Sequence, residues 1–151
     1  MKHKALRITL IVIEAIIGLG ALGGGITILT GAFDQWLLLG WLQDTPFSDY
    51  TIPGLILLIV VGGGMLLAAA TVFVQREWAV LLQASMGLVM IGFEVFEVAI
   101  IDRNTQAIIP STVAQQALMS GLGLVIFGLA SYLWMSEYRE HHFPTSPVSH
   151  A

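Results

Sequence analysis

Long apolar runs dominate the chain between positions 6 and 135, and short connections separate them. Four of these runs reach the length of roughly 20 residues that an α-helix needs to cross the hydrocarbon core of a bilayer. The pattern predicts an all-α protein, a four-transmembrane-helix bundle with up-down-up-down connectivity. The expected spans are residues 6–29, 52–74, 78–101 and 113–135.

Composition supports a membrane protein and excludes several other classes. Of the 151 residues, 56% are hydrophobic and only 11% are charged, whereas an ordinary soluble domain has about 25% charged residues. So few charges cannot cover the apolar surface of a small soluble monomer. The absence of cysteine excludes disulfides, thiolate metal sites and cysteine nucleophiles. The net charge of −4 argues against nucleic acid as a partner.

The four spans leave room for one membrane domain, residues 1–135, and a polar tail, residues 136–151. The first span could be a signal peptide, but its apolar run is too long and is interrupted by Glu14, which favours a retained helix. The tail contains the adjacent pair His141 and His142, which could bind a metal. We expect instead a disordered, solvated tail and no metal site.

Lysine and arginine residues are distributed unevenly between the two sides of the predicted bundle. Cytoplasmic loops carry the excess of these residues, so the side with five of them is expected to be cytoplasmic. The sequence therefore predicts a multi-pass protein of the plasma (inner) membrane with both termini in the cytoplasm. Lys2, Lys4, Arg7, Arg76 and Arg139 lie on one side, and Arg103 lies on the other.

The connection between the first two spans is long and unusually apolar. Trp36 and Trp41 flank a leucine run within it. Tryptophan is enriched at membrane interfaces, so we expect a short interfacial helix in this external loop, with both indoles as anchors. The alternative is a lid or binding loop.

The run from Thr45 to Gly54, TPFSDYTIPG, leads into the second span. Asp49 or Thr51 can cap that helix, and Pro53 is tolerated in its first turn. With the leucine-rich residues that follow, this run resembles a family of small uncharacterised four-helix bacterial integral membrane proteins. The resemblance implies the four-helix fold and no particular activity.

Small residues recur at helical spacing on three spans. In a bilayer, helices associate through close packing of such residues. They predict either a tight bundle within one chain or a homo-oligomer, and the sequence does not separate the two. The candidate packing positions are Gly20, Gly24, Gly64, Ala68, Ala117, Gly121 and Gly128.

Three glutamates lie inside the predicted spans, where carboxylates are costly and usually face the protein interior. On the first span, the face of Glu14 continues through glycine and alanine residues. On the third, Glu94 and Glu97 share a stripe with Gln83 and Gly87. The intramembrane polar candidates are Glu14, Gln83, Glu94, Glu97, Gln116 and Ser120.

The glutamates have structural interpretations and one functional interpretation. Glu14 could pair with Arg7, Glu94 could be a hydrogen-bonded structural carboxyl with Gln116 or Ser120 as partner, and Glu97 could reach the outer interface. Together they could instead form a proton or cation pathway.

The sequence contains no catalytic motif and no phosphate-binding loop, so neither an enzyme nor a cofactor is expected. The favoured function is a non-enzymatic accessory, scaffold or assembly subunit, whose partners are the lipid bilayer and either its own copies or a larger membrane complex. One alternative is an oligomeric proton-coupled small transporter or channel that uses the glutamates. Another is a lipid or quinone binder.

Overall fold

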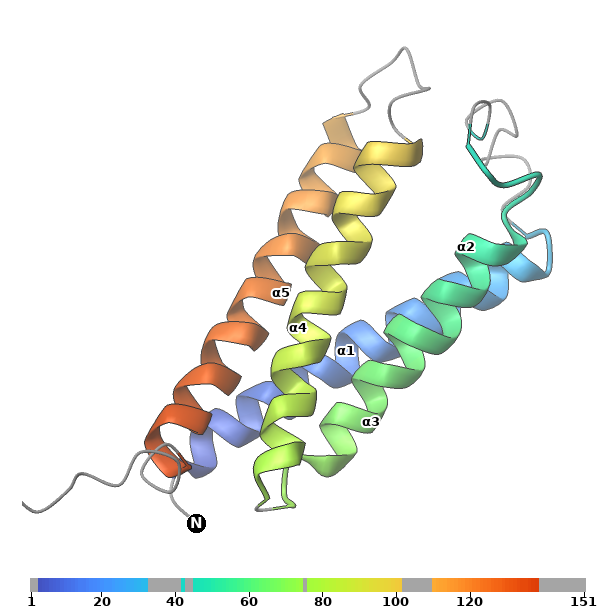
Figure 1. Cartoon of the computed structure of the whole chain (residues 1–151). Helices are drawn as coiled ribbons and strands as arrows, with labels where there is room; N and C mark the ends of the chain where they lie inside the picture. The colour runs from blue at the N-terminus through green and yellow to red at the C-terminus, as the bar shows by residue number, and fades with distance from the viewer. Residues whose placement is uncertain (1–2, 33–41, 43–44, 75, 102–109, 139–151) are drawn as a thin grey trace, which may run out of the picture.

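The computed structural model describes residues 3–32, 42, 45–74, 76–101 and 110–138, and every regular element among them is helical (Figure 1). Three consecutive elements, two α-helical and one a wider π-helical segment, form one continuous second helix. The elements are α1 (Lys4–Leu29), α2 (Thr51–Leu55), η2 (Ile56–Gly63), α3 (Gly64–Thr71), α4 (Glu77–Phe96), η3 (Glu97–Ile101) and α5 (Pro110–Glu137).

Four helices among the described residues are long and apolar enough to cross a membrane. They confirm the predicted number and kind of elements, and their bounds differ from the expected ones by only a few residues. The last helix runs two residues into the segment expected to be the tail. The four candidate spans are Lys4–Leu29, Thr51–Thr71, Glu77–Ala99 and Val113–Glu137.

The helices form two layers, one made of α1 with the helix α2–η2–α3 and the other made of α4 with α5 (Figure 1). Between the layers, α3 contacts α4 and α1 contacts α5. No Cα atoms of α1 and α4 come within 8 Å of each other. The four helices therefore surround a common interior in which α1 lies diagonally opposite α4.

The layers lie close together at one end and diverge at the other (Figure 1). The first end contains the start of α1 and is called the Arg7 end below. The opposite end contains the start of α2 and is called the Tyr50 end. Near it, the ring of Phe47, in the segment before α2, packs edge-on against Phe96 of α4 with centroids 5.8 Å apart.

The second helix widens into a π-helix from Ile56 to Gly63, three residues after Pro53. Proline lacks the backbone N–H that an α-helical turn uses. Local π-type adjustment is one way in which an apolar helix satisfies the backbone groups that proline releases. Pro53 lies in the first turn of α2, as the sequence predicts, and it is buried.

Glycine contacts within each layer bring backbones close together, although not mainly at the predicted positions. A methyl group on Gly87 of α4 would lie 2.7 Å from the Gly123 carbonyl oxygen of α5. In the other layer, a methyl group on Gly62 would lie 3.0 Å from the backbone nitrogen of Leu22. Neither Gly87 nor Gly123 was among the expected packing positions.

The expected packing residues divide into two groups. Three face the interior: Gly24 faces Leu57, Gly64 faces Met86 and Ala68 is fully buried. The other four do not pack against another helix in the described part of the chain, so a role for them in contacts between copies stays a prediction. A Cβ atom at Gly20, Gly121 or Gly128 would have nothing within 4 Å, and Ala117 is exposed.

Candidate functional site

Arg7 is the most buried charged residue that sequence reasoning did not place in the interior. It lies in the second turn of α1 with 1% of its surface exposed. Its Nη1 donates to the Val72 carbonyl oxygen, just past the end of α3, at 2.5 Å. Its Nη2 forms an ion pair with Glu137 Oε2, in the last turn of α5, at 2.6 Å. One guanidinium group therefore connects three helices.

The expected alternative in which Arg7 pairs with Glu14 is wrong. Glu14 lies two turns further along α1 and its carboxyl oxygens bond to no described residue, whereas Arg7 bonds to Val72 and Glu137. The buried Arg7 Nε is without a hydrogen-bond partner in the described part of the chain. A positive charge is favourable at the C-terminus of a helix. The Val72 carbonyl group lies at the C-terminus of α3, so the Arg7 guanidinium group is favourably placed there.

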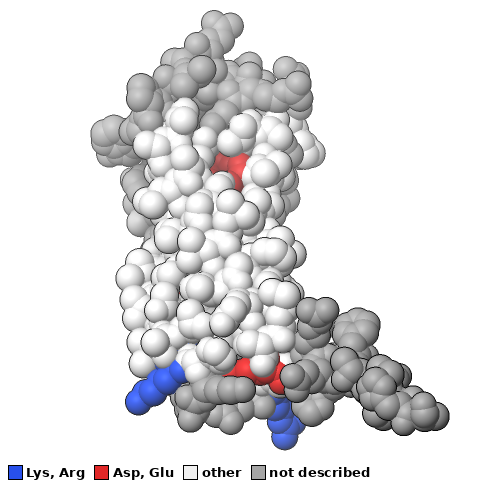
Figure 2. All heavy atoms as spheres, turned by 90° about the vertical axis from the view of Figure 1, so that its left-hand side faces the viewer, with Lys and Arg blue, Asp and Glu red and all other residues white. Residues whose placement is uncertain are grey.

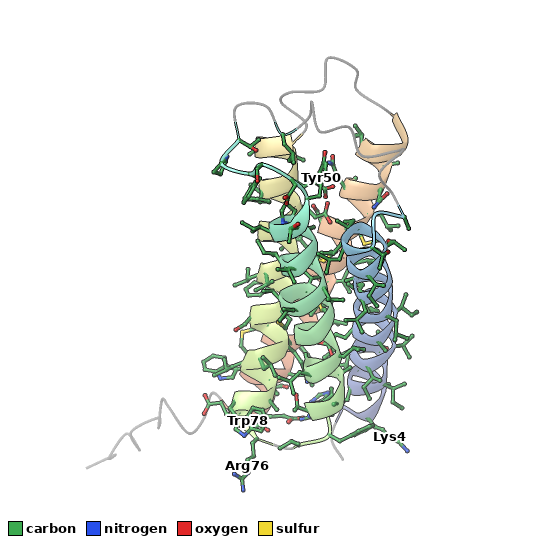
Figure 3. All side chains as sticks on the ribbon, turned by 90° about the vertical axis from the view of Figure 1, so that its right-hand side faces the viewer. Lys4, Tyr50, Arg76 and Trp78 are labelled. Carbon is green, nitrogen blue, oxygen red and sulfur yellow. The ribbon has the colours of Figure 1, made fainter. Side chains whose placement is uncertain are left out.

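A second polar contact closes the α4–α5 layer at the same end. The indole Nε1 of Trp134 donates to Glu77 Oε1 at 2.9 Å and joins the end of α5 to the start of α4. Lys4 and Arg76 also lie at this end, opposite Tyr50 (Figure 3). On the face seen in Figure 2, Lys and Arg are confined to this end, and uncharged surface covers the middle of the helices.

Glu14 points into the interior, as predicted from its face. Gly18, Ala21 and Gly25, which continue that face, are buried as well. Glu14 has no exposed surface, and neither carboxyl oxygen has a hydrogen-bond partner among the described residues. A buried carboxyl group without partners is costly in apolar surroundings.

Gln83 is the counterpart of Glu14 on α4. Of the predicted stripe, Gln83, Gly87 and Glu94 are buried, whereas Glu97 is partly exposed. Gln83 is fully buried, and both its amide oxygen and its amide nitrogen are without partners in the described part of the chain. The sequence predicted the face correctly, but it did not predict that Gln83 would be left without a protein partner.

The remaining polar candidates lie toward the Tyr50 end. Glu94 is 5% exposed and Gln116 is 9% exposed, so both are buried, whereas Glu97 and Ser120 are partly exposed. Partnership between Glu94 and the polar residues of α5 stays a prediction.

The sequence predicted that Asp49 or Thr51 caps the second helix, whereas the structure has Tyr50 at the N-cap and Asp49 one residue before it. The backbone N–H of Thr51 donates to Asp49 Oδ1 at 2.8 Å. This hydrogen bond lowers the pKa of Asp49 from its ordinary value, because it favours the ionised carboxylate. Burial raises the pKa of the neighbouring Tyr50. Asp49 is therefore the residue that supports the start of the second helix.

Some expected features lie outside the described residues. Trp36 and Trp41, the expected interfacial anchors, and His141 and His142 of the tail are among them. Within the described ranges, no group of three or more His, Asp or Glu side chains is arranged to hold a metal ion. Searches against protein-family models, curated proteins and solved structures gave no match.

Proposed function

We propose that this chain is a multi-pass protein of the bacterial plasma membrane and acts as a non-enzymatic assembly or scaffold subunit. The four apolar helices support the membrane location. Large apolar side chains also point outward along every one of them, as lipid-facing residues do. The family suggested by the run from Thr45 to Gly54 supports the same four-helix arrangement with up-down-up-down connectivity.

The orientation that we propose places both termini in the cytoplasm. Lys4, Arg7 and Arg76, the described lysine and arginine residues, belong to the Arg7 end. Short cytoplasmic loops carry the excess of positive charge in membrane proteins. The interfacial helix around Trp36 and Trp41 would then lie on the outer surface.

The observation that carries the assembly role is an unused small face on α5, consisting of Ala117, Gly121 and Gly128. The three residues are separated by four and seven positions, so they share one side of the helix. A Cβ atom at Gly121 or Gly128 would meet no other atom within 4 Å. Because close approach over small residues drives helix association in lipid, this face suits another transmembrane helix.

The last span is also the least buried of the four candidate spans. Only 22% of its most apolar window is buried inside the chain, compared with 33–39% for the other three spans. Glycine in a helix interior is unfavourable by about 1 kcal/mol relative to alanine. Two outward glycines on α5 therefore weaken the helix without any packing benefit inside this chain, and contact with a second helix would offset that cost.

Purification in mild detergent, followed by native mass determination, tests the proposal. We expect an assembly of defined stoichiometry that is heavier than the 16.3 kDa chain. Gly121→Leu fills the open position on α5, so it should leave the bundle folded and dissociate the assembly. The matched control is Gly92→Leu on α4, where a side chain also meets open space. A wild-type monomer, or an assembly that Gly121→Leu does not weaken, contradicts the proposal.

A proton-coupled transporter or channel is the second candidate, favoured by the buried and unpartnered Glu14. A stable monomer or simple homo-oligomer whose transport depends on Glu14 would favour it over an assembly subunit. The lipid or quinone binder rests on Trp36 and Trp41 alone, and a lipid or quinone that co-purifies would favour that function.

A further inference from the structure

Glu14 and Gln83 belong to the same level of the bundle interior. Contacts at the Arg7 end fix a common reference level for all four helices: Arg7 meets Val72 and Glu137, and Trp134 meets Glu77. From these reference residues, the chain rises by about 1.5 Å per residue along each helix. Six or seven residues therefore lead to a level about 10 Å inside the bundle.

Four residues occupy this level, one from each helix. Three of them are six or seven positions from the reference residue of their helix, the residue of α3 is placed by the close contacts of Gly62 with Gly18 and Leu22, and all four have no exposed surface. The polar pair lies on one diagonal, because α1 is diagonally opposite α4, and the apolar pair lies on the other. The four residues, called the Glu14 layer below, are Glu14 of α1, Ala68 of α3, Gln83 of α4 and Ala130 of α5.

The polar atoms of the Glu14 layer require hydrogen-bond partners. Two carboxyl oxygens and both amide atoms are buried without a protein partner in the described part of the chain. Buried polar groups in folded proteins nearly always bond to protein or to ordered water. An ionised carboxylate would also need a counter-charge, since burial of a lone charge is far more costly than burial of a neutral group.

No such counter-charge faces Glu14 from the surrounding helices. The nearest cation on its own helix, Arg7, is about 10 Å away along α1 and is already bonded to Val72 and Glu137. The helix α2–η2–α3 contains no titratable side chain. Besides Arg7, α1 itself contains the titratable group Lys4, and the other elements around Glu14 contain Glu77, Glu94 and Glu97 on α4 and η3 and Tyr132 and Glu137 on α5.

We propose that Glu14 and Gln83 form an interior proton-binding site, in which a neutral Glu14 carboxyl group and the Gln83 amide share a water molecule. In this arrangement, each polar atom of the two side chains has a hydrogen-bond partner. The carboxyl O–H and the amide N–H₂ donate to the water, and the water donates its two hydrogens to the amide oxygen and the carboxyl carbonyl oxygen. The proton comes from bulk water.

Infrared spectroscopy of the full chain in lipid vesicles tests this site. The carbonyl stretch of a protonated carboxyl group should be present at neutral pH in the wild type and lost in Glu14→Gln. It should persist in Glu94→Gln, the matched control at the other buried carboxyl. Glu14→Gln keeps the size and polarity of the side chain, so it should fold.

Gln83→Met tests whether the two side chains share one site, because methionine has a similar size and makes no comparable hydrogen bond. We expect the Glu14 band to shift to higher frequency as its hydrogen bonds weaken. If Gln83→Met does not fold, Gln83→Asn, which shortens the amide, should shift the band in the same direction by a smaller amount.

Three results would overturn the proposal. One is a wild type in which Glu14 is ionised at neutral pH. Another is an ionised-carboxylate band that responds to added sodium or potassium, which would indicate a cation site instead. The third is a Glu14 band that does not move in either Gln83 variant.

Discussion

Arg7 Nη2 and Glu137 Oε2 lie 2.6 Å apart, although 130 positions separate the two residues in the sequence. The contact joins the beginning of α1 to the end of α5. Because the same guanidinium group also bonds to Val72, it holds α1, α3 and α5 together at the end where the two helix layers meet. At the opposite end the layers diverge (Figure 1).

Removal of Glu137 should destabilise the bundle because it leaves the buried Arg7 without its counter-charge. Loss of one partner from a buried ion pair destabilises by about 3–5 kcal/mol. Because the Glu137 side chain is 14% exposed, we expect the destabilisation by Glu137→Ala to lie near the lower end of this range. Thermal unfolding in detergent micelles measures the change.

The double variant Arg7→Met with Glu137→Ala serves as the control for this pair. Because an apolar replacement for both partners avoids an uncompensated charge, it should be more stable than Glu137→Ala alone. If the loss of stability in the double variant equals the sum of the losses in Arg7→Met and in Glu137→Ala, the two side chains do not act as a pair.

Gly87→Ala should destabilise the α4–α5 layer. The added methyl group would lie 2.7 Å from both the Gly123 carbonyl oxygen and the Phe127 nitrogen, and these backbone atoms can move only with the helix. Overpacking of this kind costs about 1–3 kcal/mol. Unfolding by a denaturing detergent gives the measurement.

Gly92→Ala on the same helix is the matched control, because its methyl group would have nothing within 4 Å. It should be neutral or more stable by up to about 1 kcal/mol, owing to the higher helix propensity of alanine. Equal effects of the two substitutions would contradict the close backbone contact.

The sequence predicted those features that depend on periodicity within one helix. Apolar run lengths gave the four candidate spans, and steps of three and four residues placed Glu14 and Gln83 on buried faces. Both predictions follow from the geometry of a single helix, which the chain determines locally.

Features that depend on which helices become neighbours were not predictable in the same way. Glycine spacing did not reveal that Gly123 of α5 meets Gly87 of α4 while Gly121 faces outward. Gly121 and Gly123 both lie in a stretch of α5 rich in small residues, so spacing alone does not tell them apart. Arg7 was assigned to the wrong partner, since its pairing with Glu137 requires the first and last helices to be adjacent. An arginine in the first helix and a glutamate near the end of the last one were the only available signal.

The start of the second helix should respond to acid through Asp49. Its pKa is lowered by the hydrogen bond from the Thr51 N–H, so the ionised form stabilises this turn. That stabilisation is present above the ordinary aspartate pKa and is lost as the pH falls through the lowered pKa.

Nuclear magnetic resonance of the Thr51 amide in micelles measures this titration. We expect a midpoint below that of an ordinary aspartate and no titration in Asp49→Asn. A midpoint at or above the ordinary value would show that the hydrogen bond does not favour the carboxylate.

The claim on which the proposed role and the interior site both depend is that the chain crosses the membrane four times with the Arg7 end in the cytoplasm. Single cysteines at positions 45 and 149 can be introduced into a chain that contains none. A thiol reagent that does not cross membranes, applied to intact cells, should label Thr45→Cys and leave Ser149→Cys unlabelled until the cells are opened. Labelling of Ser149→Cys but not Thr45→Cys would reverse the orientation, and equal labelling of both would contradict the odd number of spans, three, between the external loop and the cytoplasmic tail.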